Sequence, residues 1–209
     1  MEKTDLKKLF KNYYNASTQP ELVSFGKAEF LSITGKGDPS SSSFKNSIQA
    51  LYSVAYGIKF HYKSQGKDFV VAKLEGLWWF DNKRFGQPSM REAPLKVPRD
   101  EWQWRLLIRI PEYVEESQIQ LCKEKVMQKK GLPLTDAVEY FEMGKGQFVQ
   151  VLHQGPFDKE PESLAKLEAF MTQKRLKKAG LHHEIYLSDF TKTAPEKLKT
   201  ILREPVYSM

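Results

Sequence analysis

The sequence repeats one run of elements, and this repeat constrains the fold more than any other feature of the chain. The strand-like segment 30–37 is echoed by the segment 148–155. Each copy is followed by an amphipathic helical pattern and then by a strand that carries a glutamate, Glu75 in the first copy and Glu184 in the second. A duplicated strand-helix-strand-strand unit would form a cleft at its pseudo-two-fold axis, with an acid from each half.

These patterns predict an α+β fold in which duplicated strand-helix-strand-strand units form an antiparallel sheet with the helices packed on one side. The chain has 209 residues, of which 40% are hydrophobic, so it is long for one domain but short for two. We therefore expect a single domain over residues 1–209. Its parts are an N-terminal arm at 1–28, a first repeat at 29–114, a connecting helix at 115–136 and a second repeat at 137–209.

The elements of the repeats follow from local patterns. Residues 69–80 are rich in β-branched and aromatic side chains and predict a strand, and residues 102–110 alternate as a second strand. Between them, residues 81–99 predict a long loop over one end of the sheet and a possible lid. The basic run 174–178 is predicted to end the helix of the second repeat, where cations complement the helix dipole.

Composition limits the kinds of partner and compartment. The net charge of +7 is compatible with a polyanionic partner, but the basic residues are scattered and no nucleic-acid-binding motif accompanies them, so we disfavour nucleic acid. The single cysteine, Cys122, excludes an intrachain disulfide and fits a reducing, cytoplasmic setting. The first residues lack the apolar core of a signal peptide, and no window is apolar enough for a membrane span.

Glu184 has two neighbours that make it a candidate for chemistry. Strand alternation places it on the same face as His182 and Tyr186. A carboxylate in an aromatic cleft can pair with a cationic organic ligand or act as a base toward water. The alternative is an exposed acid that pairs with a lysine across the sheet. The same choice applies to Glu75.

All four tryptophans fall in two pairs on strands that the repeat makes adjacent. Core packing explains one or two of them, whereas an aromatic cage beside a carboxylate would use more. The tyrosines at the edge of the first predicted helix, and one on the strand that opens the second repeat, extend the possible wall. The predicted ligand-binding residues are Trp78, Trp79, Trp102, Trp104, Tyr52, Tyr56, Tyr140 and His182.

Other chemistries have no support in the sequence. The four histidines lack the spacing of metal ligands, so we predict no metal site. The turn at 35–37 is too short for a phosphate-binding or dinucleotide loop, and no Gly-x-Ser-x-Gly motif occurs. We therefore expect no cofactor.

Five segments together resemble a known family. They are residues 30–39, 50–56, 74–79, 152–158 and 181–203. These segments resemble the stand-alone branch of the GyrI-like small-molecule-binding proteins, and the resemblance runs over almost the whole chain. It implies a duplicated strand-helix-strand-strand fold with a ligand cleft at the pseudo-two-fold axis.

The resemblance also implies site residues and an activity. Regulators of this family join such a domain to a DNA-binding helix-turn-helix and hold cationic, lipophilic drugs with a cleft glutamate, which Glu184 matches. This chain shows no such DNA-binding segment. It therefore resembles single-domain members similar to hydrolases that open the cyclopropane ring of DNA-alkylating toxins. By that analogy, a flat ligand lies between aromatic walls, Glu184 with Glu75 activates water, and Tyr186 donates to the developing oxyanion.

Three classes of function remain at this point. The first is a detoxifying hydrolase that binds a planar, lipophilic molecule. The second is a non-catalytic protein that binds or sequesters such molecules, including cationic ones. The third is a modulator that interacts with gyrase. Turnover separates the first class from the second, and a supercoiling assay tests the third.

Overall fold

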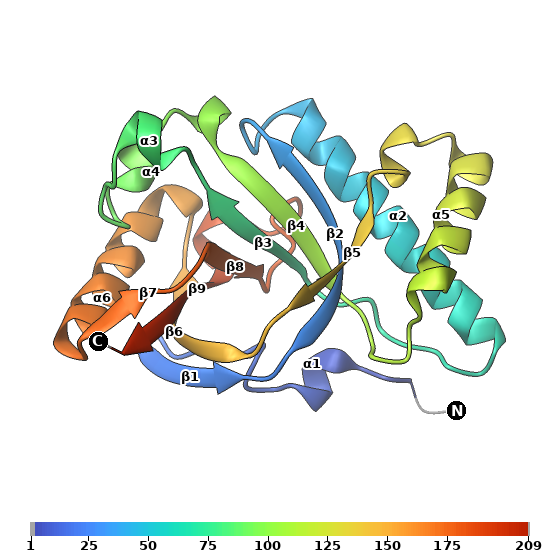
Figure 1. The fold of residues 1–209 in the computed structure, drawn as a ribbon, viewed down its shortest axis with the longest axis horizontal. Helices are drawn as coiled ribbons and strands as arrows, with labels where there is room; N and C mark the ends of the chain where they lie inside the picture. Colours follow the sequence, from blue (N-terminus) through green and yellow to red (C-terminus); the bar gives the residue numbers. More distant parts are fainter. Residues whose placement is uncertain (1–2, 209) are drawn as a thin grey trace.

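The structure, a computed structural model, describes residues 3–208 as one large antiparallel sheet with helices packed against it (Figure 1). The strands are β1 (Glu21–Phe25), β2 (Ala28–Lys36), β3 (Leu74–Trp79), β4 (Gln103–Arg109), β5 (Glu139–Met143), β6 (Gly146–Gln154), β7 (Leu176–Lys178), β8 (His182–Tyr186) and β9 (Lys199–Ser208). The helices are α1 (Leu6–Leu9), α2 (Ser42–Ser64), α3 (Asn82–Phe85), α4 (Ala93–Lys96), α5 (Glu116–Lys130) and α6 (Glu160–Gln173). Short 3-10 turns occupy Arg99–Glu101, Pro133–Thr135, Phe157–Lys159 and Pro195–Lys197.

The strand order is symmetric about its centre. It runs β1-β6-β9-β8-β3-β4-β2-β5, and β7 adds to β9. Outward from the central β8-β3 pair, β3-β4-β2 on one side matches β8-β9-β6 on the other. In sequence, α2 follows β2 and α6 follows β6. The prediction of an α+β fold with an antiparallel sheet and helices on one side is confirmed.

The two halves exchange their leading strands. β1, which precedes the first run, pairs with β6 of the second, and β5, which precedes β6, pairs with β2 of the first. Each half therefore completes the sheet of the other. This exchange supports our proposal that the chain folds as one domain. It also makes Glu21–Phe25, part of the expected N-terminal arm, an edge strand of the sheet.

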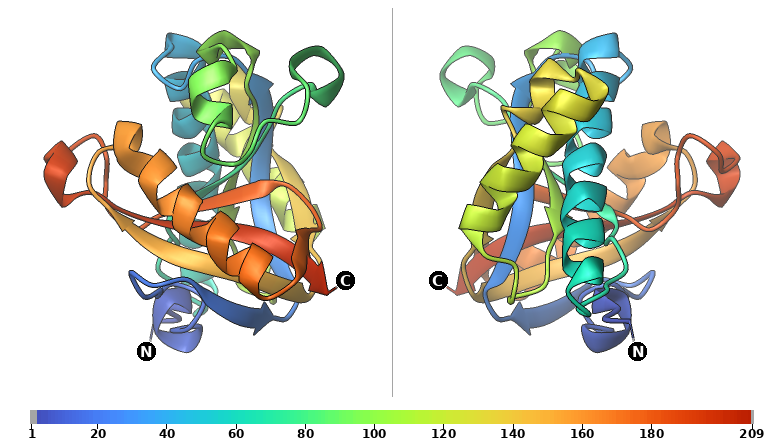
Figure 2. Two further views of the ribbon diagram at one scale, coloured as in Figure 1. Left: turned by 90° about the vertical axis from the view of Figure 1, so that its left-hand side faces the viewer. Right: turned by 90° about the vertical axis from the view of Figure 1, so that its right-hand side faces the viewer.

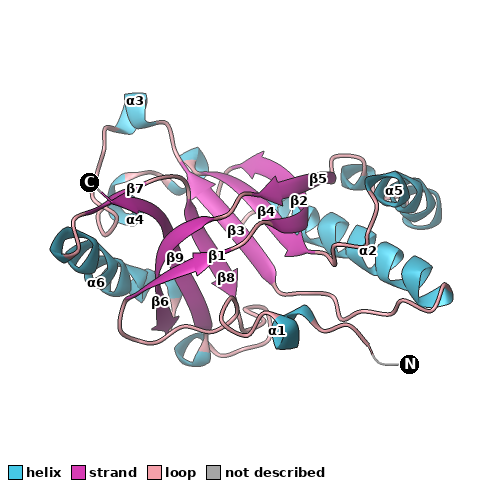
Figure 3. Cartoon of the chain, turned by 60° about the horizontal axis from the view of Figure 1, so that its bottom comes forward, coloured by secondary structure: helices cyan, strands magenta, loops and turns pink. Residues whose placement is uncertain are grey.

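The core has one layer on each face of the sheet. Buried side chains of α2, including Leu51 and Ile58, pack on the first half, and Leu164 and Leu167 of α6 pack on the second half. Each such side chain contributes about 2 kcal/mol through burial. Figure 2 shows α2 and α5 side by side, and Figure 3 shows α6 at one end of the sheet and α2 and α5 at the other. On the opposite face, the arm that contains α1 covers a second apolar layer.

Two local predictions are corrected. The predicted strand at 69–80 begins only at Leu74. The basic run 174–178 does not end a helix, because α6 stops at Gln173 and Arg175 takes a left-handed φ of 54°. Leu176–Lys178 then forms β7 along the end of β9. The backbone groups of β9 offer hydrogen bonds there that a longer helix would leave unmade.

Candidate functional site

A cavity of about 890 Å³ lies over the central β3-β8 pair, between the starts of α2 and α6. This volume falls in the range of sites for organic ligands, about 300–1,000 Å³. Aromatic rings make much of its wall: Phe44, Trp78, Trp79, Phe80, Trp102, Phe157, Tyr186 and Phe190. Charged side chains also line it: Arg99, Asp158, Glu160, Lys178, His182, Glu184 and Glu204. The cavity is therefore an aromatic box with a charged group of residues along β8 and β9.

Strand alternation on β8 builds the floor. His182, Glu184 and Tyr186 are alternate residues of one strand, and all three line the cavity. Gly76 on β3 is paired with Glu184 and leaves room for two rings to meet above it. The indole Nε1 of Trp78 donates a hydrogen bond to the hydroxyl of Tyr186 at 3.1 Å.

Gly76→Ala is expected to disturb this floor. A Cβ at residue 76 would lie 2.8 Å from Nε1 of Trp78 and 3.1 Å from the hydroxyl of Tyr186, so the two rings must separate. We expect a loss of about 1–3 kcal/mol in the free energy of unfolding, as for other overpacked sites, and weaker ligand binding. Urea unfolding and ligand titration measure both. Gly144→Ala is the control, since a Cβ there meets nothing within 4 Å. Equal effects of the two variants would contradict the prediction.

His182 joins two carboxylates. Its Nδ1 lies 2.6 Å from Oε1 of Glu204, and its Nε2 lies 3.3 Å from Oε1 of Glu184. Burial opposes the charged imidazolium, but Glu204 and Glu184 outweigh this effect and raise the pKa of His182 to about 10. Burial likewise opposes the charged form of Glu204, yet His182 and Lys178 hold the pKa of its carboxyl below the usual value. Nζ of Lys178 lies 2.9 Å from Oε2 of Glu204.

The raised pKa of His182 predicts a pH-dependent stability. An unfolded histidine has a pKa of about 6.5. The contribution of the imidazolium to stability is therefore fully present below about pH 6.5 and is lost as the pH rises through about 10. His182→Gln should therefore lower the free energy of unfolding on the order of 3 kcal/mol near pH 6 and much less near pH 10. Urea titrations of both proteins at these pH values measure the difference. A difference that does not change with pH would contradict the raised pKa.

Glu160 lies at the start of α6 and lines the same cavity. Its side chain is buried, and its Oε1 has no hydrogen-bond partner among residues 3–208. Burial and, next, the charge of Glu184 raise the pKa of Glu160 well above the usual range. Glu160 is not among the site residues predicted from the sequence, so this acid was missed.

The structure brings six of the predicted site residues to the cavity and leaves five elsewhere. The six are Trp78, Trp79, Trp102, His182, Glu184 and Tyr186. The five that do not line it are Glu75, Trp104, Tyr52, Tyr56 and Tyr140. Phe44, Phe157 and Phe190 were not predicted, although Phe44 begins the apolar stripe of the helix that the sequence did predict.

Glu75 lies on the other face of the sheet. In the β3-β8 pair, Glu75 is opposite Ile185, whereas Glu184 is opposite Gly76. Paired residues share a face and successive residues alternate, so the two glutamates point in opposite directions. The expectation of an acid from each half in one cleft is therefore corrected. Glu75 is fully buried and accepts hydrogen bonds from the hydroxyls of Tyr13 and Tyr14.

The other four predicted residues lie in the core or on the surface, away from the cavity wall. Trp104 is buried beneath Gly35 and meets the ring of Phe44 edge-on. Tyr56 is exposed on α2, whereas Tyr52 is partly buried against the core. Burial, followed by the nearby Tyr56 and Asp189, raises the pKa of Tyr52 to about 12. Tyr140 is on β5, at the edge of the sheet farthest from β1. Each was predicted from residue type, which does not tell a core or surface ring from a cavity wall.

The long loop after β3 forms one wall of the cavity. It contains the short helices α3 and α4, and the residues from it that line the cavity are Asn82, Gln87, Pro88, Met90, Ala93, Pro94, Leu95 and Arg99. Ion pairs of Arg84 with Glu101 and of Arg99 with Asp38 connect the loop to its surroundings. Its placement over the cavity is compatible with a lid, and the lid motion stays a prediction.

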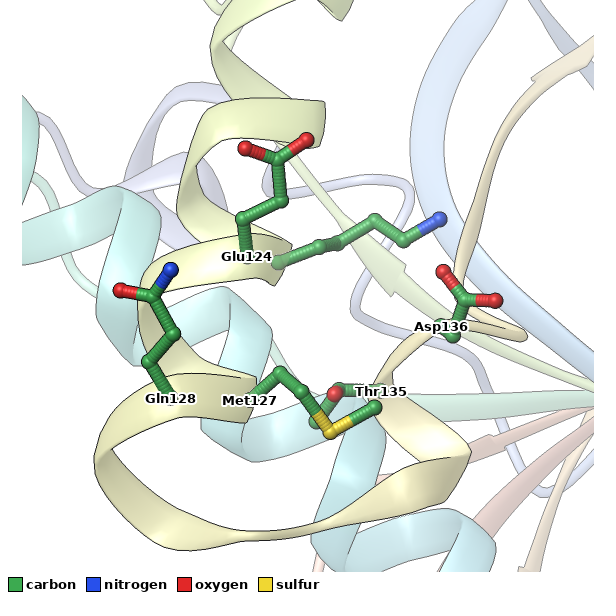
Figure 4. Close-up of a pocket in the computed structure, with 6 residues that line it drawn as sticks. Glu124, Met127, Gln128, Thr135 and Asp136 are labelled. Carbon is green, nitrogen blue, oxygen red and sulfur yellow. The ribbon is translucent and has the colours of Figure 1, made fainter.

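A second hollow is too small for a comparable ligand. It measures about 170 Å³ and lies between α5 and the turn at Pro133–Thr135 (Figure 4). Its walls are mainly flexible polar side chains. In residues 3–208, no three histidine, cysteine or acidic side chains are arranged to hold a metal ion. None of the helices described is long and apolar enough to cross a membrane.

Comparisons with known proteins give the fold a family context. Residues 18–206 match the family model described as a GyrI-like small molecule binding domain. The chain is similar to an uncharacterized conserved protein from Listeria innocua, with 36% identity, a TM-score of 0.87, and coverage of 98% of this chain and 100% of that one.

Two further solved structures from Listeria innocua are described as hydrolases. One has 35% identity, a TM-score of 0.84, and coverage of 98% of this chain and 100% of the other. The second, encoded by lin2189, has 34% identity, a TM-score of 0.85, and coverage of 99% and 100%. A search of curated proteins gave no match.

Proposed function

We propose, from the premise that this chain belongs to the GyrI-like small-molecule-binding family, that its cavity binds a planar, lipophilic molecule and hydrolyses a cyclopropane ring in it. The observation that carries this proposal is the position of Glu184. Its carboxylate lies on the floor of an aromatic cavity, beside His182 and Tyr186 and away from bulk solvent. A base in such a place can act on one bound water molecule.

The walls favour a flat ligand. Trp78 and Trp102 meet edge-to-face with ring centroids 6.4 Å apart, and Phe80 packs on Trp102 at 5.1 Å. Phe157 and Phe190 also line the cavity, and both rings pack edge-on against Tyr186. Rings of this kind bury a large apolar area of a planar molecule and exclude water from it.

The charges favour a neutral ligand over a cation. Glu184 and Glu204 are the two carboxylates of the floor, and His182 and Lys178 are the two cations beside them. Glu184 therefore already has a cationic partner inside the protein. A binder of lipophilic cations would gain most from a cleft carboxylate that has no such partner. This balance makes non-catalytic drug binding the second candidate.

The chemistry then assigns roles to two residues. Glu184 accepts a proton from water while the water oxygen attacks a carbon of the strained ring. His182 is a positioning residue, because its Nε2 lies 3.3 Å from Oε1 of Glu184 on the same face of β8. The hydrolase descriptions of the two Listeria innocua proteins support this reaction class for the present chain. Its role would be to destroy DNA-alkylating toxins inside the cytoplasm.

Turnover tests the proposal. Trace protein is mixed with an excess of a spirocyclopropylcyclohexadienone, and ring opening is followed by absorbance and by the mass of the hydroxylated product. We expect many equivalents of product for each protein molecule. Conversion that stops at one equivalent, with tryptophan fluorescence still reporting ligand binding, would leave sequestration as the function. Gyrase supercoiling should be unaffected by the protein, and inhibition would favour the gyrase modulator.

A further inference from the structure

A second acid in the cavity has no assigned role. Glu160 is only 9% exposed, and its Oε1 has no hydrogen-bond partner in the part of the chain that the structure describes. Buried polar atoms are nearly always paired, because an unpaired one lowers stability. Since Glu160 lines the cavity, the missing partner of Oε1 can be an atom of the ligand.

Glu160 and Glu184 have different surroundings in the cavity. Burial and the neighbouring Glu184 raise the pKa of Glu160 well above its usual range, which favours its protonated form. Glu184, in contrast, has Nε2 of His182 3.3 Å from its Oε1. The pair thus offers one carboxylic acid and one carboxylate in the same cavity, an arrangement that divides acid and base roles between two similar residues.

The phenol of Tyr186 is a weaker candidate for proton donation. Burial and, next, the charge of Glu184 raise the pKa of Tyr186 well above its usual value. A carboxylic acid gives up its proton more readily than such a phenol at neutral pH.

We infer that Glu160 is a catalytic residue that donates a hydrogen bond, and then its proton, to a carbonyl oxygen conjugated with the ring that opens. This inference rests on the proposed function and names the ligand class: a neutral, planar molecule with a conjugated carbonyl group. A hydrocarbon of the same shape would leave Oε1 of Glu160 unpaired.

Glu184 and Glu160 together accept and supply the protons that the reaction requires. The water oxygen forms a bond to a ring carbon, and Glu184 takes a proton from that water. The carbon-carbon bond of the cyclopropane breaks, and its electron pair moves through the conjugated system to the carbonyl oxygen, which takes the proton of Glu160 and becomes a phenol. Glu184 then holds a proton and Glu160 is charged, and transfer of that proton between them restores the starting state.

A matched pair of planar probes tests the hydrogen bond. 9-Fluorenone carries a conjugated carbonyl, and fluorene has the same rings without it. Quenching of Trp78, Trp79 and Trp102 reports binding, because all three line the cavity. Wild-type protein should bind fluorenone about tenfold more tightly than fluorene. Glu160→Leu should lose this preference, whereas Glu160→Gln, which keeps a donor, should retain most of it.

Ring opening separates the hydrogen bond from the proton transfer. Glu160→Gln should bind fluorenone but slow ring opening by about a hundredfold. The wild-type rate should fall as the pH rises through the raised pKa of Glu160, and this fall should be absent in Glu160→Gln. Glu162→Gln is the control, because its side chain on α6 is exposed and does not line the cavity. Thermal unfolding should show both Glu160 variants folded, since each removes an unpaired buried carboxyl.

The outcomes separate this inference from the proposed function. If wild-type protein binds both probes equally, or if Glu160→Leu keeps the preference for fluorenone, the inference fails while planar-ligand binding stands. Unchanged turnover in Glu160→Gln also overturns the proton-donor role. If wild-type protein binds neither probe and opens no cyclopropane, the proposed function fails, and the inference fails with it.

Discussion

Glu184→Gln is expected to slow cyclopropane opening by about a thousandfold, within the range that a general base contributes. The substitution keeps the size of the side chain and removes its ability to take a proton from water. Glu184 is on the central strand β8, and its neighbour His182 holds it toward the cavity. Affinity for 9-fluorenone should change by less than about threefold, because binding draws mainly on the aromatic walls.

Glu162→Gln is the control for Glu184→Gln, because each substitution removes the charge of one glutamate. Glu162→Gln, on the exposed side of α6, should open the ring at the wild-type rate. If Glu184→Gln also retains the wild-type rate while its product is the same hydroxylated compound, then another group activates water. If instead the affinity and kcat/KM fall by the same factor while kcat is unchanged, Glu184 holds the ligand and is not the base.

The face of β8 could be predicted from the sequence because strand alternation is local. His182, Glu184 and Tyr186 are two residues apart in one strand, and no distant contact is needed to place them together. The sheet and its helices could be predicted from local patterns of the same kind in the repeated segments.

The position of Glu75 could not be predicted in this way. Its face depends on the register between β3 and β8, where Glu75 pairs with Ile185 and not with Glu184. A shift of one residue in register moves a side chain to the other face, and a similarity between two copies does not fix register that closely. The duplication therefore indicated the cleft correctly but overstated its symmetry.

Glu160 and β7 were missed for a related reason. Glu160 lines the cavity because the start of α6 lies close to β8. β7 forms because Leu176–Lys178 pairs with the end of β9 near the chain terminus. Both are tertiary contacts between segments whose local patterns also fit a helix start and a helix end. The aromatic residues Phe157 and Phe190 reach the cavity from turns, where no periodic pattern marks the inward side.

The network around Glu75 indicates a structural role on the far face of the sheet. The hydroxyl of Tyr13 lies 2.7 Å from Oε2 of Glu75, that of Tyr14 lies 3.3 Å from Oε1, and Nε2 of His183 lies 2.8 Å from Oε2. Burial lowers the pKa of His183 despite Glu75, so its neutral ring donates through Nε2. The fully buried Arg203 bonds to the carbonyl of Tyr13 at 2.7 Å. Glu75 thus provides the acceptor and the negative charge of a network that attaches the N-terminal arm to the sheet.

Glu75→Leu is expected to lower the free energy of unfolding by about 3–5 kcal/mol, because it leaves three buried donors unpaired and the charge of Arg203 without its nearby carboxylate. For a chain of this size, the loss corresponds to a melting temperature lower by about 10 °C. Calorimetry measures it, and Glu142→Leu is the control. Its partner Lys27 is exposed, and such surface pairs contribute at most about 1 kcal/mol.

The same variant separates structure from catalysis at Glu75. Well below its melting temperature, Glu75→Leu should open the cyclopropane at close to the wild-type rate per folded molecule, because the side chain points away from the cavity. A variant with unchanged melting temperature and no turnover would reverse this assignment and place Glu75 in the reaction. Loss of stability with retained turnover would instead show that one face of β3 and β8 anchors the arm while the other carries the chemistry.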